Sequence, residues 1–85
     1  MVSFSYVIRD ELGIHARPAG MLAKLASTFQ SKIVIDCPGG SADAKRLISI
    51  MKLGTQKGDT AAFTIEGDDE EAAAAALEKF MQENL

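Results

Sequence analysis

The only histidine of the chain lies in the segment Gly13-Ile14-His15-Ala16-Arg17-Pro18-Ala19, at the start of a predicted helix. An imidazole is largely neutral at pH 7, which leaves one ring nitrogen as a nucleophile. The first N–H groups of the helix, at about Ala16 and Arg17, have no intrahelical acceptor and favour an anion. Arg17 adds a guanidinium whose donors match phosphate oxygens. A nucleophile beside an anion site is what reversible phosphoryl transfer requires.

The same residues have a simpler interpretation. A lone histidine followed by an arginine near the start of a helix is more often a surface or capping residue. The segment is too short to decide between the two interpretations. His15 is therefore a candidate nucleophile at this point, and Arg17 is its candidate electrostatic partner.

A short predicted helix at residues 47–51 carries more apolar side chains than one buried face can hold. They form either an exposed docking patch, which Met21 on the first helix could join, or only a wide core stripe. Basic residues in or beside the same two helices favour acidic protein partners, unless they form an ordinary solvated face. The apolar residues are Leu47, Ile48, Ile50 and Met51, and the basic ones are Arg17, Lys24, Lys45, Arg46 and Lys52.

Hydrophobic periodicity predicts the elements that position these groups. Alternation from Val2 to Ile8 predicts a strand with one buried face. Apolar residues at helical spacing from Leu22 to Phe29 predict a helix that starts near His15 or Ala16. Pro18 is compatible with this helix because the N–H groups of a first turn have no acceptor in any case.

The remainder of the chain continues with short elements. The β-branched residues of 32–37 predict a second strand, and Pro38-Gly39 predicts a type II turn into a third strand at 41–44. Alternation at 61–65 predicts a fourth strand, after the helix at 47–51.

The last predicted element is a helix with an apolar stripe from Ala73 to Met81. Asp68 or Asp69 is the expected cap, and Asp68 with Glu71 resembles a capping box. The order β-α-β-β-α-β-α predicts an α+β fold, a four-stranded antiparallel sheet with three helices on one face.

Composition narrows the classes of function. The 85 residues predict a single domain over residues 1–85, and a net charge of −3 disfavours a general nucleic-acid binder. One cysteine and one histidine exclude an intramolecular disulfide and a structural zinc site within one chain, so we expect no metal. We find no apolar run of transmembrane length and no signal peptide, which predicts a cytoplasmic protein without direct membrane insertion.

The segment from Gly13 to Ala19, with Leu53-Gly54 and Lys57-Gly58 at matching distances, resembles the HPr family. These are the histidine-containing phosphocarriers of the bacterial phosphoenolpyruvate-dependent sugar phosphotransferase system. The resemblance covers essentially the whole chain, including its length and element order. It implies an open-faced β-sandwich with three helices, in agreement with the pattern. It also implies a phosphoryl carrier without cofactor, rather than an enzyme with its own turnover.

The resemblance also implies roles for individual residues. In the family, enzyme I phosphorylates the active histidine at Nδ1, and the group passes to enzyme IIA proteins for sugar uptake. By this resemblance His15 forms the phosphohistidine, Arg17 is its electrostatic partner, and the amides of Ala16 and Arg17 help to hold the phosphate. The chain is expected to act as a monomer. The implied docking face for both partners comprises Gly20, Met21, Lys24, Leu47, Ile48 and Met51.

Arg46 departs from the pattern of many family members, which carry a regulatory serine at the start of the second helix. An arginine cannot accept the phosphate of a serine kinase, so we expect that regulation to be absent. Two alternatives to the carrier hypothesis stay open on the sequence. One is an HPr paralogue that acts as a regulatory protein-binding module, and the other is an unrelated α+β interaction domain with an incidental histidine.

Overall fold

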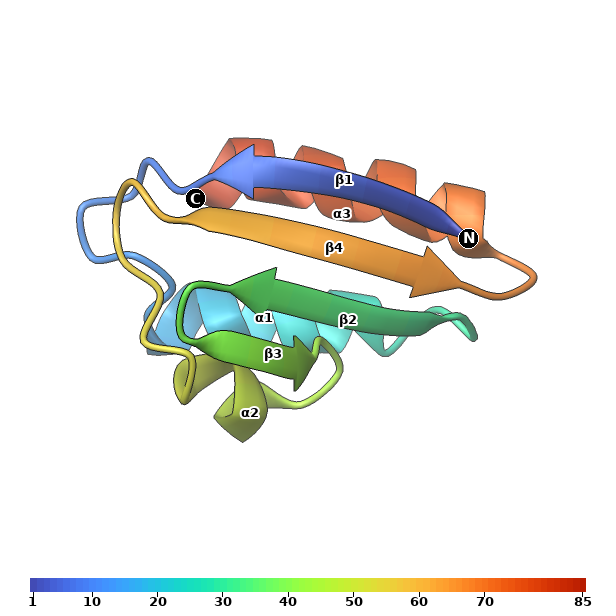
Figure 1. Cartoon of the computed structure of the whole chain (residues 1–85). Helices are drawn as coiled ribbons and strands as arrows, with labels where there is room; N and C mark the ends of the chain where they lie inside the picture. The colour runs from blue at the N-terminus through green and yellow to red at the C-terminus, as the bar shows by residue number, and fades with distance from the viewer.

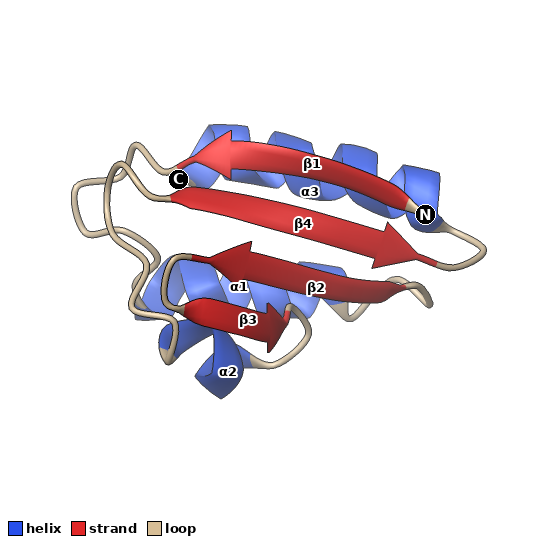
Figure 2. Ribbon diagram, viewed as in Figure 1, coloured by secondary structure: helices blue, strands red, loops and turns tan.

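The computed structural model describes all 85 residues and has the predicted element order. Its four strands form one antiparallel sheet in the order β1-β4-β2-β3. In Figure 1, α1 and α3 lie behind this sheet and α2 lies next to α1 at the β3 edge, and Figure 2 shows that the front face carries no helix. The predicted open-faced β-sandwich is thus confirmed. The elements are β1 (Val2–Val7), α1 (Ala16–Ala26), β2 (Lys32–Cys37), β3 (Gly40–Asp43), α2 (Leu47–Met51), β4 (Thr60–Glu66) and α3 (Glu70–Asn84).

The core lies between the sheet and the helices, as the alternation along the strands requires. Phe63 on β4 is fully buried and pairs with Phe4 on β1, and their rings stack with centroids 4.8 Å apart. α3 packs behind β1 and β4 and buries Leu77 and Met81 against them. Twenty buried apolar residues form this one cluster. None of the helices has the length and apolar character that a membrane crossing requires.

The turn between β2 and β3 differs from the predicted type II turn. That turn would require a positive φ at Gly39, whereas the positive φ of this segment, 134°, is at Gly40. Gly39 serves another purpose, because a Cβ atom at this position would lie 2.1 Å from the carbonyl oxygen of Leu53. The glycine therefore allows the turn to approach the segment that follows α2.

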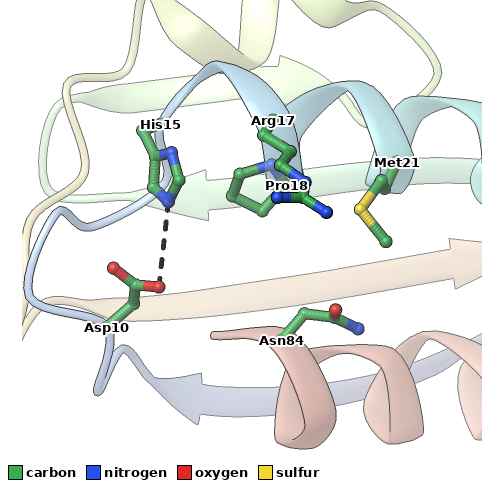
Figure 3. Close-up of a pocket in the computed structure, with 6 residues that line it drawn as sticks. All are labelled: Asp10, His15, Arg17, Pro18, Met21 and Asn84. Carbon is green, nitrogen blue, oxygen red and sulfur yellow. Dashed lines mark ion pairs between the residues drawn. The ribbon is translucent and has the colours of Figure 1, made fainter.

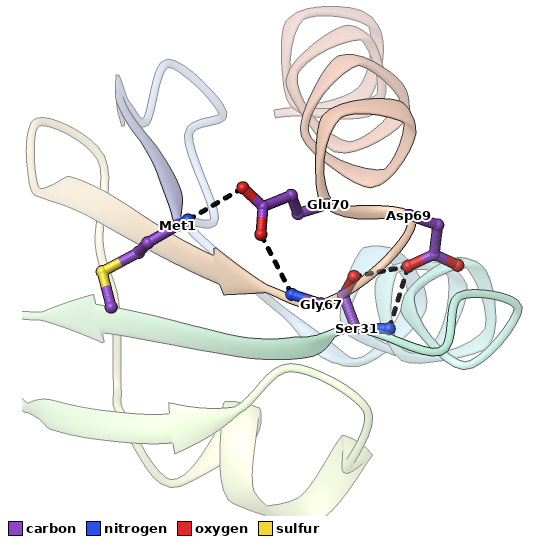
Figure 4. A network of polar contacts seen from close by, with 5 residues as sticks. All are labelled: Met1, Ser31, Gly67, Asp69 and Glu70. Carbon is purple, nitrogen blue, oxygen red and sulfur yellow. Dashed lines mark hydrogen bonds and ion pairs between the residues drawn. The ribbon is translucent and has the colours of Figure 1, made fainter.

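The predicted capping box of Asp68 with Glu71 is wrong, because Asp69 and not Asp68 is the N-cap residue of α3. Asp69 occupies the N-cap position, but its carboxylate makes no cap bond. It accepts a hydrogen bond from the amide of Gln30 at 2.8 Å. It also accepts from the amide of Ser31, at 2.9 Å, and from the Ser31 hydroxyl (Figure 4). The long-range partners outcompete the local ones, so Asp69 ties the α1–β2 connection to α3. These donors hold the pKa of the Asp69 carboxyl below its usual value, with the Ser31 hydroxyl as the largest cause.

Glu70 completes this end of the molecule. Its carboxylate accepts from the amide of Gly67 at 3.1 Å and pairs with the Met1 ammonium at 2.8 Å (Figure 4). The ammonium, more than the amide, lowers the pKa of the Glu70 carboxyl. Both acidic residues therefore join α3 to other segments of the chain.

The depressed pKa of Asp69 predicts acid sensitivity. The stability that this carboxylate contributes is present above the pKa of an unfolded aspartate, about 3.9, and is lost as the pH falls through the lower folded value. Urea unfolding of Asp69→Asn should show a lower midpoint at pH 7 and a weaker dependence on pH between 5 and 3. Asp68→Asn, at an exposed neighbour, is the control and should behave as the parent does. Equal midpoints for the parent and Asp69→Asn at pH 7 would contradict this assignment.

Candidate functional site

The loop before α1 is fixed by a close backbone contact at Gly13. This residue has φ +67°, and a Cβ atom there would lie 2.1 Å from the carbonyl oxygen of Thr55. The same oxygen accepts a hydrogen bond from the amide of Ile14 at 3.1 Å. Ile14 and Pro18 are buried on either side of His15. These anchors leave the imidazole partly exposed at the start of the helix.

His15 is the N-cap residue of α1, in an extended conformation. Its carbonyl oxygen accepts from the amide of Ala19 at 3.0 Å, which begins the helical hydrogen bonds. The amides of Ala16 and Arg17 have no acceptor within the chain, and Pro18 has no N–H. The two open donors are therefore those expected from the sequence, directly after the imidazole.

His15 and Arg17 line a common pocket of about 210 Å³ with Pro18, Met21, Asp10 and Asn84 (Figure 3). The His15 side chain is 35% exposed, so the ring is neither sealed in the core nor free of it. Arg17 forms no salt bridge within the chain, and the first turn of α1 contains no acidic residue. The Arg17 guanidinium therefore has no carboxylate partner in the chain, which leaves it free to pair with an anion.

Two residues of the pocket were not predicted. Asp10 Oδ2 lies 3.8 Å from His15 Nε2, and Asn84 comes from the end of α3. Asp10 lies between the predicted first strand and the predicted first helix. Its Oδ1 accepts from the amide of Leu12 at 2.8 Å. Aspartate commonly makes this bond in a turn, so its residue type could have predicted a fixed side chain before His15. Nothing in the sequence pattern brings Asn84, 69 positions from His15, to the same place.

Both α2 and α1 carry exposed apolar side chains. Ile50 alone is buried in α2, whereas Leu47, Ile48 and Met51 are exposed, Ile48 by 62%. Met21 on α1 is also exposed, and α1 lies beside α2. The wide core stripe considered above is therefore wrong. We call Met21, Leu47, Ile48 and Met51 the apolar patch.

The basic residues around this patch are not equivalent. The Lys45 ammonium donates to the carbonyl oxygen of Phe29 at 2.8 Å, so it tethers two segments. Arg46 is the N-cap residue of α2, its side chain is 76% exposed, and its Nε lies 3.7 Å from an oxygen of Asp43. Lys24 is exposed and contributes to a second, apolar pocket between α1 and α3. Gly20 on α1 has open space where a Cβ atom would be.

Comparison with known proteins places this site in context. The family model described as the PTS HPr component phosphorylation site matches residues 2–83. The phosphocarrier protein HPr of Mycoplasma genitalium is 40% identical over 85 residues, 99% of this chain and 97% of that protein.

Among the similar solved structures, two have the same fold over nearly the full length of both chains. One is a histidine-containing phosphocarrier protein studied for the divergence of Mycoplasma from Gram-positive bacteria. It has a TM-score of 0.93 and 33% identity, covering 96% of this chain and 93% of that one. The other is HPr-C-His from Thermoanaerobacter tengcongensis, with a TM-score of 0.90, 35% identity and coverage of 96% and 92%.

The surroundings of Gly13 and Gly20 predict that replacement by alanine has opposite effects on stability at the two positions. Gly13→Ala places a methyl group against the Thr55 carbonyl at an unfavourable φ, and should lower the free energy of unfolding by about 1–3 kcal/mol. Gly20→Ala in the open helical position should raise it by about 0.5–1 kcal/mol. Urea denaturation measures both, and a Gly13→Ala protein as stable as the parent would show that the contact does not constrain the loop.

Proposed function

The chain belongs to the HPr family, the phosphocarriers of the phosphotransferase system, and we propose that it accepts a phosphoryl group from enzyme I on His15 and passes it to enzyme IIA. The observation that carries this proposal is the position of His15. Its partly exposed ring stands at the N-cap of α1, directly before two amides that lack acceptors. An acceptor nucleophile and an anion site thus occupy one pocket.

The proposed reaction needs little covalent machinery from the chain. The Nδ1 lone pair of His15 forms the bond to phosphorus while the bond to the donor breaks and its electron pair leaves with the donor. The amides of Ala16 and Arg17 and the Arg17 guanidinium then face the phosphoryl oxygens. Transfer to enzyme IIA reverses these roles, so a cofactor is not needed and the chain acts as a reactant.

A carrier must also release the group, which limits how tightly the site can hold it. The pocket is shallow enough that a third of the His15 side chain faces solvent. An attacking group on a partner can therefore reach the phosphorus from outside. The protein contributes orientation and charge, and the partners contribute closure of the site.

We assign partner docking to the apolar patch together with Gly20 and Lys24. The patch lies on α1 and α2, and α1 also begins at the site, so one partner surface can cover both. Arg17, Lys24 and Arg46 surround it with positive charge on a chain of net charge −3, which favours acidic partner surfaces. A monomer is sufficient for this relay.

Arg46 removes one form of regulation from this proposal. It stands at the N-cap of α2, the position of the regulatory serine in many family members, and has no hydroxyl to phosphorylate. We therefore expect no transfer from ATP by a serine kinase at this position. The permanent positive charge instead favours docking at all times.

Incubation with enzyme I and phosphoenolpyruvate should give an acid-labile, base-stable adduct on the chain. His15→Ala should abolish it, whereas Arg17→Ala should keep the adduct but lower the rate of transfer roughly 10- to 100-fold, because one charged donor to the phosphoryl group is lost. Mass spectrometry and single-turnover kinetics measure the two effects. A full adduct in His15→Ala would contradict the proposal. Failure of the parent chain to restore sugar uptake in a strain without HPr would also contradict it.

The apolar patch predicts a defect of association without a defect of chemistry. Ile48→Thr should raise the KM of enzyme I for this chain about 3- to 30-fold with little change in kcat, because an exposed apolar contact is lost. Val7→Thr makes a similar substitution at a position 53% exposed on the open face of the sheet, and should leave KM unchanged. Equal KM values for the two variants would remove Ile48 from the docking face.

A further inference from the structure

Asp10 occupies the side of His15 opposite to the helix. Oδ2 of its carboxylate lies 3.8 Å from His15 Nε2, and the dashed line in Figure 3 marks this ion pair. The other ring nitrogen, Nδ1, lies on the side of α1 in the same view. The two nitrogens of the imidazole therefore have different surroundings, a carboxylate for Nε2 and the start of a helix for Nδ1.

We propose that Asp10 is a positioning residue for phosphoryl transfer: its carboxylate holds the ring proton on Nε2 and leaves the Nδ1 lone pair free for phosphorus. This inference rests on the proposed role of His15 as acceptor, and it adds the residue that sets the tautomer of that acceptor. A neutral imidazole carries its proton on one nitrogen only, and an acceptor beside that nitrogen selects the tautomer.

Hydrogen bonds of the Asp10 side chain and backbone hold the carboxylate in place. Oδ1 accepts from the amide of Leu12 at 2.8 Å, and the backbone oxygen of Asp10 accepts from the amide of Gly13 at 3.0 Å. The amide of Asp10 donates to an oxygen of Leu85 at 2.9 Å. One carboxylate oxygen is thus used to fix the loop, and the other faces the imidazole.

The distance of 3.8 Å is a charge contact and is longer than a hydrogen bond. Catalytic contacts are often long before the substrate binds. A movement of about 1 Å would bring the pair to hydrogen-bond distance. The His15 side chain is partly exposed, so the ring can make that movement toward the fixed carboxylate.

The proposed tautomer keeps the reaction balanced in both directions. When Nδ1 bonds to phosphorus, its lone pair is used and the ring, still protonated on Nε2, gains a positive charge beside the Asp10 carboxylate. When the group leaves, the electron pair of the P–N bond returns to Nδ1, and the ring departs as a neutral imidazole. Without a proton on Nε2 the leaving group would be an imidazolide anion, a much poorer one.

No other carboxylate of the pocket can replace Asp10. The remaining lining residues are His15, Arg17, Pro18, Met21 and the neutral Asn84. Glu11 is adjacent in sequence, but its carboxylate pairs with Lys57 at 2.9 Å. Glu11→Gln is thus a matched control that removes one negative charge from the same loop without touching the imidazole.

The test compares Asp10→Asn, Asp10→Ala and Glu11→Gln in the full chain. Asp10→Asn keeps an oxygen for the Leu12 amide, so the loop can persist. The ¹⁵N shifts of the His15 ring, measured where the imidazole is neutral, should show Nε2 protonated in the parent and in Glu11→Gln. Both Asp10 variants should move the two ring shifts toward each other. A merely structural role for Asp10 would leave this tautomer ratio unchanged, and that result would overturn the inference.

Kinetics with enzyme I and phosphoenolpyruvate give the second readout. Both Asp10 variants should lower the kcat of enzyme I with this chain about two- to fivefold, with little change in KM. This range is what a partly exposed ion pair can contribute. Glu11→Gln should leave kcat unchanged. Unchanged kcat in both Asp10 variants would also overturn the inference while leaving the phosphocarrier function intact. Failure of the proposed carrier role is a separate result, because it would appear as a phosphoryl adduct that persists in the His15→Ala variant.

Discussion

The approach of Gly13 to the carbonyl of Thr55 is the contact on which the site depends. It lets the chain turn sharply from the sheet into α1, and the adjoining Ile14–Thr55 hydrogen bond fixes the turn. The turn ends with His15 as the N-cap residue and with two amides pointing out of the helix without acceptors. A side chain at Gly13 would move this start. The groups of the candidate site are thus neighbours in sequence, from His15 to Arg17. Their geometry is set by Thr55, which lies far along the chain.

The remainder of the fold serves the same site from both ends of the chain. The amides of Arg9 and Asp10 donate to an oxygen of Leu85, which brings the end of α3 to the pocket. At the other end of the sheet, Asp69 and Glu70 attach the start of α3 to the α1–β2 connection and to Met1. Both ends of α3 are therefore fixed by contacts with other segments, and one of these ends lies at the pocket that contains the imidazole.

The sequence predicts what periodicity and local chemistry determine. It predicts the element order, the open-faced sandwich, the helix start at His15 and Ala16, and the excess of apolar residues at 47–51. It fails where long-range contacts override local preference. Asp69 and not Asp68 is the N-cap residue of α3, and its carboxylate accepts from Ser31 and Gln30 instead of capping the helix. The positive φ lies at Gly40 rather than at Gly39. Asp10 and Asn84 reach the pocket only through the fold, which no spacing reveals.

The central claim is that one imidazole and the two amides after it hold the phosphoryl group. NMR of the ¹⁵N-labelled chain, before and after phosphorylation by enzyme I, tests this directly. The account predicts a phosphorus-coupled Nδ1 of His15 and downfield amide proton shifts confined to Ala16, Arg17 and their neighbours. Phosphorus on any other residue, or amides of Ala16 and Arg17 that do not respond, would contradict it.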